Sequence, residues 1–320
     1  MFEGDPFLSA FGETTITSCD IDAFQHHGGI CQNRASVGPM AVGIYPWGYW
    51  LNWTGAGAAR HQQRGCVMDS GKHDRQLHEL PGATSVLAVC AHPDDESFGL
   101  GATLASFTAA GSSTAVLCFT HGESSTLGAI STELGQVRAA ELVDAASELG
   151  VDHVELFDYP DGALNRQPID RLAKHVCQMA DRVRPDLLLV FDEGGVTGHL
   201  DHGRATDAAL EFARDTRLPV LAWAVAQPVA TTLNEEFGTT LVGRTPVDLD
   251  FEVHVDRGRQ RRAIIRHASQ ATDNPVLLRR LEVQGDREVL RWLVAPSEGS
   301  LICARNGLSP LSNQDNDQEG

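Results

Sequence analysis

The chain has 320 residues, of which 42% are hydrophobic and 21% are charged. This composition is ordinary for a folded protein and excludes a fibrous or wholly disordered chain. Twenty-five basic residues against 43 acidic ones leave a formal net charge of −18. Because such a charge repels the phosphates of nucleic acids and anionic membrane surfaces, we expect no nucleic-acid partner.

Two further features limit the class of protein. No window holds the roughly 18 consecutive apolar residues that a membrane-spanning helix needs, and the opening residues lack the basic start and apolar run of a secretory signal. We therefore expect no membrane span and a cytoplasmic location. The seven cysteines include no CxxC pair. This argues against a disulfide framework or a cysteine-ligated zinc site.

The chain divides into three parts of different composition. Residues 1–80 are rich in Gly, Gln and His and show no helical or alternating period, which predicts a loop-rich or disordered extension. Residues 81–297 have a regular pattern and form the predicted main domain. Residues 298–320 are predicted to be a polar tail.

Apolar strands alternate with helices along the main domain. The pattern predicts strands at 85–90, 114–119, 154–157, 186–191 and 220–225, with helices at 98–110, 133–149, 169–183 and 202–214. A strand at 250–255 and helices at 257–270 and 275–283 are expected to follow. This alternation predicts an α/β fold, a Rossmann-like and mostly parallel sheet with helices on both faces. Ligands of such folds bind at the carboxyl ends of the strands.

The first strand is followed directly by the sequence AHPDDE at 91–96. Three carboxylates in succession repel one another unless a cation or hydrogen bonds offset their charge, so a bound metal explains them most simply. In the alternative interpretation, Asp94 and Asp95 only cap the next helix, because Asp is a favoured N-cap residue.

A second cluster, GHLDH at 198–202, follows the strand at 186–191. It brings His199, Asp201 and His202 to the same predicted edge of the sheet. His92, Asp95 and one of these histidines would form a site of two histidines and one carboxylate with open positions for water and substrate. Such donors suit Zn²⁺, while Fe²⁺ or Mn²⁺ remains an alternative.

The two clusters together resemble the LmbE-like, or PIG-L, family of metal-dependent de-N-acetylases. The resemblance rests on AHPDDE at 91–96, on GHLDH in place of the family's GHPDH, and on their order and spacing across residues 84–295. It implies that His92, Asp95 and His202 bind the metal and that Asp94 is the general base. It also implies that His199 steadies the oxyanion or protonates the leaving amine, and that Asp201 orients a histidine.

Weaker matches and two departures complete the comparison. The resemblance implies that Arg138 and Asp161 hold substrate hydroxyls or an anionic group, and that His267 lies near the mouth of the site. An ordinary surface arginine, a turn aspartate and a packed histidine are the alternatives. Leu200 stands where the family has proline, a change that alters the stiffness of the turn. Thr197 stands where some relatives carry a tyrosine.

The sequence thus predicts a zinc-dependent hydrolase that removes the N-acetyl group from an N-acetylglucosamine-type sugar or conjugate, with no organic cofactor. A homo-oligomer is compatible with this prediction. An amidase acting on a thiol conjugate and a non-hydrolytic metal-binding relative stay open as alternatives. A nucleotide-binding protein is disfavoured because no GxGxxG opens the first helix. A non-haem iron oxygenase would use the same ligand types.

Overall fold

Strand β1 (Ser85–Cys90) is buried on both sides along its whole length. Val86 and Ala88 contribute to one hydrophobic core, whereas Leu87 and Val89 contribute to the other. This follows from the alternation of side chains along a strand. A strand covered on both faces reads as one continuous apolar run, as this one does.

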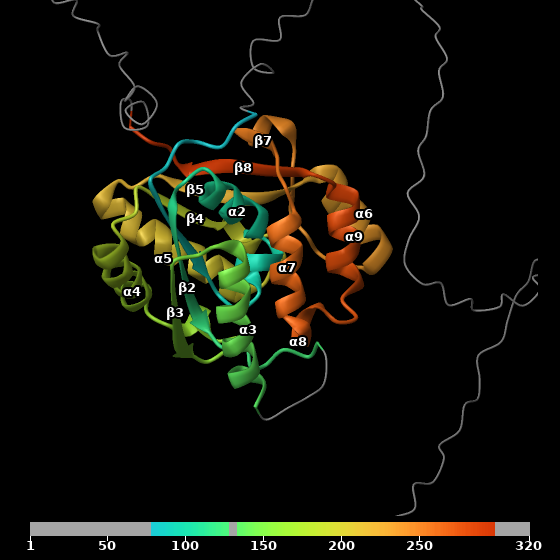
Figure 1. Ribbon diagram of the computed structural model, residues 1–320, viewed down its shortest axis with the longest axis horizontal. Helices are drawn as coiled ribbons and strands as arrows, with labels where there is room; N and C mark the ends of the chain where they lie inside the picture. Colours follow the sequence, from blue (N-terminus) through green and yellow to red (C-terminus); the bar gives the residue numbers. More distant parts are fainter. Residues whose placement is uncertain (1–77, 128–132, 298–320) are drawn as a thin grey trace, which may run out of the picture. The chain divides into compact units, whose positions relative to one another are not determined.

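The computed structural model describes residues 78–127 and 133–297, which contain a mixed eight-stranded sheet flanked by helices (Figure 1). The strand order is β3-β2-β1-β4-β5-β8-β7, with β6 paired to β5. The remaining strands are β2 (Ser113–Thr120), β3 (His153–Tyr159), β4 (Leu187–Phe191), β5 (Val220–Ala226), β6 (Gly243–Arg244), β7 (Phe251–His254) and β8 (Arg287–Val294). Residues 1–77 of the extension predicted at 1–80 lie outside the described residues, as does the whole tail predicted at 298–320.

The pairing confirms the predicted mostly parallel, Rossmann-like sheet. Strands β1 to β5 pair in parallel, and β8 runs antiparallel to both β5 and β7. From β1 the strand order continues to β2 and β3 towards one edge of the sheet, and from β4 it continues to β5 towards the other edge. The switch point of the topology therefore lies between β1 and β4. Ligands of open α/β sheets bind in the crevice at this point.

Helices cover both faces of the sheet. Residues of α2, α3, α6 and α7 share one core with the sheet, whereas α4 and α5 pack in the other. The described helices are α1 (Asp95–Phe98), α2 (Gly101–Ala109), α3 (Leu134–Leu149), α4 (Ile169–Val183), α5 (Leu200–Thr216), α6 (Gln227–Phe237), α7 (Gly258–Arg266), α8 (Ala268–Ala271) and α9 (Pro275–Gln284). No helix in the described part of the chain is both long and apolar enough to cross a membrane.

Three details of the C-terminal part differ from expectation. The helix predicted at 257–270 is two helices, α7 and α8, because the backbone leaves helical geometry at His267. The side chain of His267 is turned inward there, where it bonds Glu96. Helix α6 and strand β8 were not predicted. Strand β8 lies between β5 and β7 and thereby extends the sheet beyond its parallel part.

Candidate metal centre and active site

The loop after β1 and the start of α5 bring three predicted metal ligands together at the switch point. Nδ1 of His92 lies 3.1 Å from Nε2 of His202. The Asp95 carboxylate lies 3.2 Å from the same His202 nitrogen and 3.9 Å from Nδ1 of His92. Two imidazole nitrogens and the Asp95 carboxylate thus lie within 3.9 Å of one another, and such a set of donors suits a divalent cation with open coordination positions.

The other atoms of these side chains are held by neighbours that leave the facing atoms free. Nδ1 of His202 lies 3.2 Å from the Gly195 carbonyl oxygen, so a proton there leaves Nε2 with a free lone pair. Oδ2 of Asp95 accepts hydrogen bonds from the backbone N–H groups of Ala91 and His92. Nε2 of His92 lies 2.9 Å from Oδ1 of Asp161, within ion-pair distance. The donor set and its supports fit a metal ion.

The electrostatics of the cluster point the same way. Burial lowers the pKa of His92, but the carboxylates of Asp161 and Asp201 outweigh it and raise this pKa to about 10. Burial raises the pKa of Asp95, yet His202 holds that pKa well below its usual range. The carboxylates of Asp95, Asp161 and Asp201 therefore favour a positive charge beside them. A bound divalent cation supplies such a charge.

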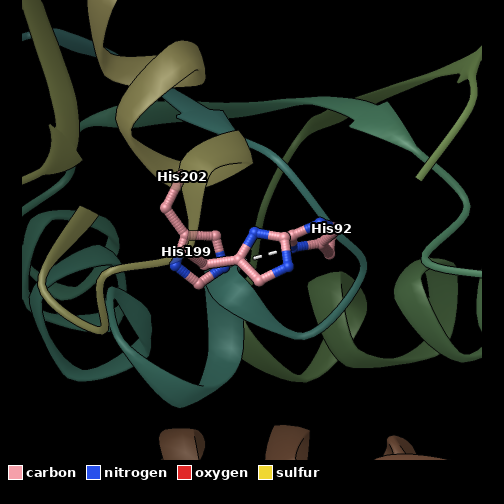
Figure 2. A group of neighbouring side chains, drawn as sticks. All are labelled: His92, His199 and His202. Atoms are coloured by element: carbon pink, nitrogen blue, oxygen red, sulfur yellow. Dashed lines mark hydrogen bonds between the residues drawn. The ribbon is translucent and has the colours of Figure 1, made fainter. Parts of the chain in front are cut away.

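His199 adds a third imidazole beside the first two, as Figure 2 shows. Its ring centroid lies 4.7 Å from that of His92 and 5.0 Å from that of His202. Ligand-type nitrogens of all three histidines lie within 4.8 Å of one another. Burial and the neighbouring histidines lower the pKa of His199, so its ring is neutral near pH 7.

Asp94 lies beside the predicted metal ligands in a strained backbone conformation, with φ at 126°. Its side chain makes no cap hydrogen bond to α1 and instead accepts one of 2.8 Å from Arg138, so the capping interpretation of Asp94 is wrong. Burial is the largest influence on its pKa and, with Asp95, outweighs Arg138 and raises this pKa to about 6. This carboxylate can therefore exchange a proton near neutral pH.

The backbone of this loop is fixed by Glu96. One carboxylate oxygen of Glu96 accepts the N–H of Asp94 at 2.9 Å, and the other lies 2.6 Å from Nε2 of His267. Both Glu96 and His267 are fully buried. His267 therefore lies behind the predicted metal ligands, and the structure does not bring it to the mouth of the site.

Asp201 and Asp161 connect the histidines to the loop after β3. The Asp201 carboxylate accepts hydrogen bonds from the N–H groups of Gly162 and Leu164, and it lies 3.6 Å from Nε2 of His92. Asp161 accepts a hydrogen bond from the Ser124 N–H on the loop after β2. These carboxylates thus hold three loops at one edge of the sheet.

Arg138 reaches the site from α3. It donates to the carbonyl oxygens of Gly122 and Pro93 as well as to Asp94, and only 3% of its surface is exposed. A β-carbon at position 122 would collide with the guanidinium group, and Gly122 has φ at 62°, so a glycine is needed there.

A cavity of about 500 Å³ opens over these residues. The predicted residues that line it are His92, Asp94, Asp95, Arg138, Asp161, His199 and His202, while Asp201 and His267 lie outside the lining. Sequence analysis missed Trp223 on β5 and Arg280 on α9, which also line the cavity. A tryptophan within an apolar strand and one arginine on a helix carry no motif that marks them in advance.

Comparison with known proteins agrees with the resemblance of the sequence to the PIG-L family. Residues 87–213 match the PIG-L family model, described as GlcNAc-PI de-N-acetylase. A 1D-myo-inositol 2-acetamido-2-deoxy-alpha-D-glucopyranoside deacetylase of Salinispora arenicola is 33% identical over 150 residues, which are 39% of this chain and 49% of the relative. A probable N-acetylglucosaminyl-phosphatidylinositol de-N-acetylase of Schizosaccharomyces pombe is 31% identical over 158 residues, 47% of this chain and 60% of the relative.

The chain spans about half of the length of the curated relatives it matches. Among solved structures, the zinc-inhibited form of teicoplanin deacetylase Orf2 has a TM-score of 0.52 and 19% identity, covering 68% of this chain and all of that one. The 4-carboxy-2-hydroxymuconate hydratase GalB of Pseudomonas putida KT2440 has a TM-score of 0.51 and 18% identity, covering 67% and 98%. Because a deacetylase and a hydratase share this fold, the fold by itself does not determine the reaction.

Proposed function

Starting from the premise that residues 87–213 form a PIG-L (LmbE-like) domain, we propose that this protein is a metal-dependent hydrolase. It removes the N-acetyl group from an N-acetylglucosamine-type sugar or conjugate and releases acetate and a free amine. The observation that carries the proposal is the meeting of Nδ1 of His92, the Asp95 carboxylate and Nε2 of His202 beside Asp94 at one cavity.

His92, Asp95 and His202 would hold the metal, for which we propose Zn²⁺, with Fe²⁺ or Mn²⁺ as the alternatives. A divalent ion in such a site polarises the amide carbonyl and lowers the pKa of a water molecule towards about 7. The free lone pair of His202 Nε2 described above suits this role, because a ligand must present an unprotonated atom to the ion.

Asp94 is the proposed general base. Its carboxylate lies beside the donor cluster, and a pKa near 6 lets it accept a proton from water at neutral pH. Arg138 donates a hydrogen bond to Asp94 and so holds the oxygen that takes the proton in a fixed position.

His199 is the proposed partner of the leaving group. Nδ1 of His199 accepts the N–H of Asp201 at 3.3 Å, so the proton of the neutral ring lies on Nε2. That N–H can donate a hydrogen bond to the developing oxyanion, whereas protonation of the departing amine requires the imidazolium form of the ring, with a second proton on Nδ1. The Asp201 carboxylate lies near Nε2 of His92 and orients the ring of His92.

Substrate contacts are proposed for Arg138 and Asp161, which line the cavity next to the donor cluster. Hydroxyl groups of a sugar would accept from the guanidinium group and donate to the carboxylate. We do not propose such a contact for the buried His267.

The test is a substrate screen with the purified full chain and added zinc. N-acetylglucosaminyl-inositols, simple N-acetylated sugars and N-acetylated thiol conjugates are assayed for amine release, with metal content measured in parallel. Release from the sugars supports the proposal, and release from thiol conjugates alone favours the amidase alternative. Bound metal without any amine release favours a non-hydrolytic relative. Turnover that requires oxygen would instead indicate an oxygenase.

The cytoplasmic location and the formation of a homo-oligomer belong to this proposal as predictions. Fractionation of cells and light scattering of the purified chain test them.

A further inference from the structure

The cavity has two halves of different chemistry on the two sides of the switch point. The half over β1, β2 and β3 holds the polar side chains of Asp94, Ser124, Arg138 and Asp161. The half next to β4 and β5 has apolar walls formed by Phe191, Trp223, Val225, Leu241 and Leu277. Thr197, His199 and His202, which follow β4, line the cavity as well. A sugar suits the first half, whereas the apolar side chains of the second half offer no partners for hydroxyl groups.

One charged side chain, Arg280, lines the apolar half. Helix α9, which carries it, begins at Pro275 and is capped by the side chain of Asn274, which accepts the Leu277 N–H. Only 6% of the surface of Arg280 is exposed. Its guanidinium carbon lies 5.1 Å from the ring centroid of Trp223, so the charge is fixed above this wall of the cavity.

Arg280 differs from the two other buried arginines of the described residues. Arg138 forms an ion pair of 2.8 Å with Asp94, and Arg257 forms one of 2.6 Å with Glu288. No carboxylate of residues 78–127 or 133–297 lies within ion-pair distance of Arg280.

The acceptors found for the guanidinium group of Arg280 are neutral. They are the carbonyl oxygen of Phe98 and Oε1 of Gln284, the latter at 2.9 Å. A guanidinium group has five N–H donors, so these two acceptors leave donors over. Burial lowers the pKa of Arg280 to about 10 against the opposing influence of the Glu288 carboxylate, which is itself ion-paired with Arg257, so the group stays charged at neutral pH. A buried charge is costly unless an opposite charge compensates it.

We infer that the apolar half of the cavity binds an apolar substituent of the substrate that ends in a carboxylate, with Arg280 as the counter-ion. The inference rests on the proposed hydrolase function, because it assigns the sugar and the amide to the polar half. An anion is disfavoured in the polar half, where Asp94 and Asp161 already place negative charge. The substituent is either attached to the sugar as a glycoside or part of the acyl group, and the second source would extend the proposed activity from N-acetyl to longer N-acyl groups.

Four compounds separate these two sources. The acyl arm compares N-glutarylglucosamine with its match in which the free carboxylate is a carboxamide. The glycoside arm compares the 3-carboxypropyl glycoside of N-acetylglucosamine with its carboxamide match. Their binding to the zinc-loaded full chain is measured by calorimetry in an Asp94→Asn background, and their hydrolysis in the wild-type background.

We expect the carboxylate of one arm to bind about 10- to 100-fold more tightly than its carboxamide match, the range for a hydrogen bond to a charged group. Arg280→Gln should bring this ratio close to one, because Gln can still donate to the Phe98 carbonyl but carries no charge. Arg279→Gln is the matched control. Arg279 is the neighbour on the same helix, is paired with Glu236 and Glu282, and does not line the cavity, so the ratio should persist.

Three outcomes overturn the inference. These are equal binding of both members in each arm, no detectable binding of either carboxylate, and an Arg280→Gln variant that weakens all four compounds alike. The last result would mean that Arg280 only ties α9 to α1. A carboxylate preference without hydrolysis of any compound would leave this subsite standing and remove the proposed hydrolase function, so the two failures are distinguishable.

Discussion

Residues 85–216 and residues 217–297 contribute to the site in different ways. The first region supplies each side chain proposed here for the metal or for proton transfer, on loops that follow β1 and β4. The second supplies side chains that reach the short helix α1 from behind. Nε2 of Gln260 donates to the carbonyl oxygens of Ser97 and Phe98, and His267 bonds Glu96. The chemistry is thus concentrated at two strand ends, and a distant segment holds it in place.

This support is needed because the loop is strained. A φ of 126° at a residue other than glycine costs about 1–3 kcal/mol and persists only where neighbours impose it. The neighbours here are Glu96, which accepts the Asp94 N–H, and His267, which fixes Glu96. Variants in the two regions should therefore fail in different ways.

The largest effect is expected for the proposed metal ligands of the first region. His92→Ala and His202→Ala each remove one of three protein donors, so both variants should lose stoichiometric metal and with it activity. Metal content by mass spectrometry checks this. Full metal occupancy in both purified variants would refute the ligand assignment.

Asp94→Asn should keep the metal and lose catalysis. Asn has the shape of Asp but cannot accept the proton of water at neutral pH, and general acid–base catalysis is worth about 10² to 10⁴ in rate. We expect a loss of that order in kcat at normal metal content. Asp95→Asn is the matched control and should weaken metal binding, with activity partly recovered at high zinc. The reverse pattern would exchange the two roles.

His267→Ala tests the second region. It leaves the buried Glu96 carboxylate without one of its partners, and breaking a buried charged pair costs about 3–5 kcal/mol of stability. The metal should remain, because its ligands are untouched, while kcat falls as Asp94 loosens. Thermal unfolding, metal content and kcat are measured together. His121→Ala is the control, because His121 pairs with the exposed Asp158 and should change little. An unchanged kcat in the folded His267 variant would remove the positioning role.

The smallest effect is expected for Leu200→Pro. Leu200 is the first residue of α5 and is 66% exposed, and proline is favoured at the first position of a helix. His199 before it has φ −71° and ψ 123°, a conformation that a following proline allows. Metal content and melting temperature should stay within error of the wild-type values. A clear loss of either would show that the turn before α5 requires leucine.

Local sequence pattern predicted the parallel part of the fold and both clusters of the site. The run at 86–90 is apolar throughout because β1 is covered on both faces. The AHPDDE cluster begins directly after β1, and the GHLDH cluster begins at Gly198, a short loop after β4 ends at Phe191. Parallel strands present their carboxyl ends at one edge, so two clusters far apart in the chain could be expected to meet there. Their residue types suffice to indicate a metal.

Only the tertiary structure decided the inward turn of His267, the position of β8 between β5 and β7, and the lack of an ion-pair partner for Arg280 within residues 78–127 and 133–297. His267 bonds Glu96 across 171 positions of sequence, and Arg280 bonds the Phe98 carbonyl across 182. Nothing in the residues beside them marks these partners, since the partner of a buried polar group depends on which helices pack together. The local pattern of a helix therefore predicts that its arginine is exposed on the surface. Only the packing of the helices shows that Arg280 lines the cavity instead.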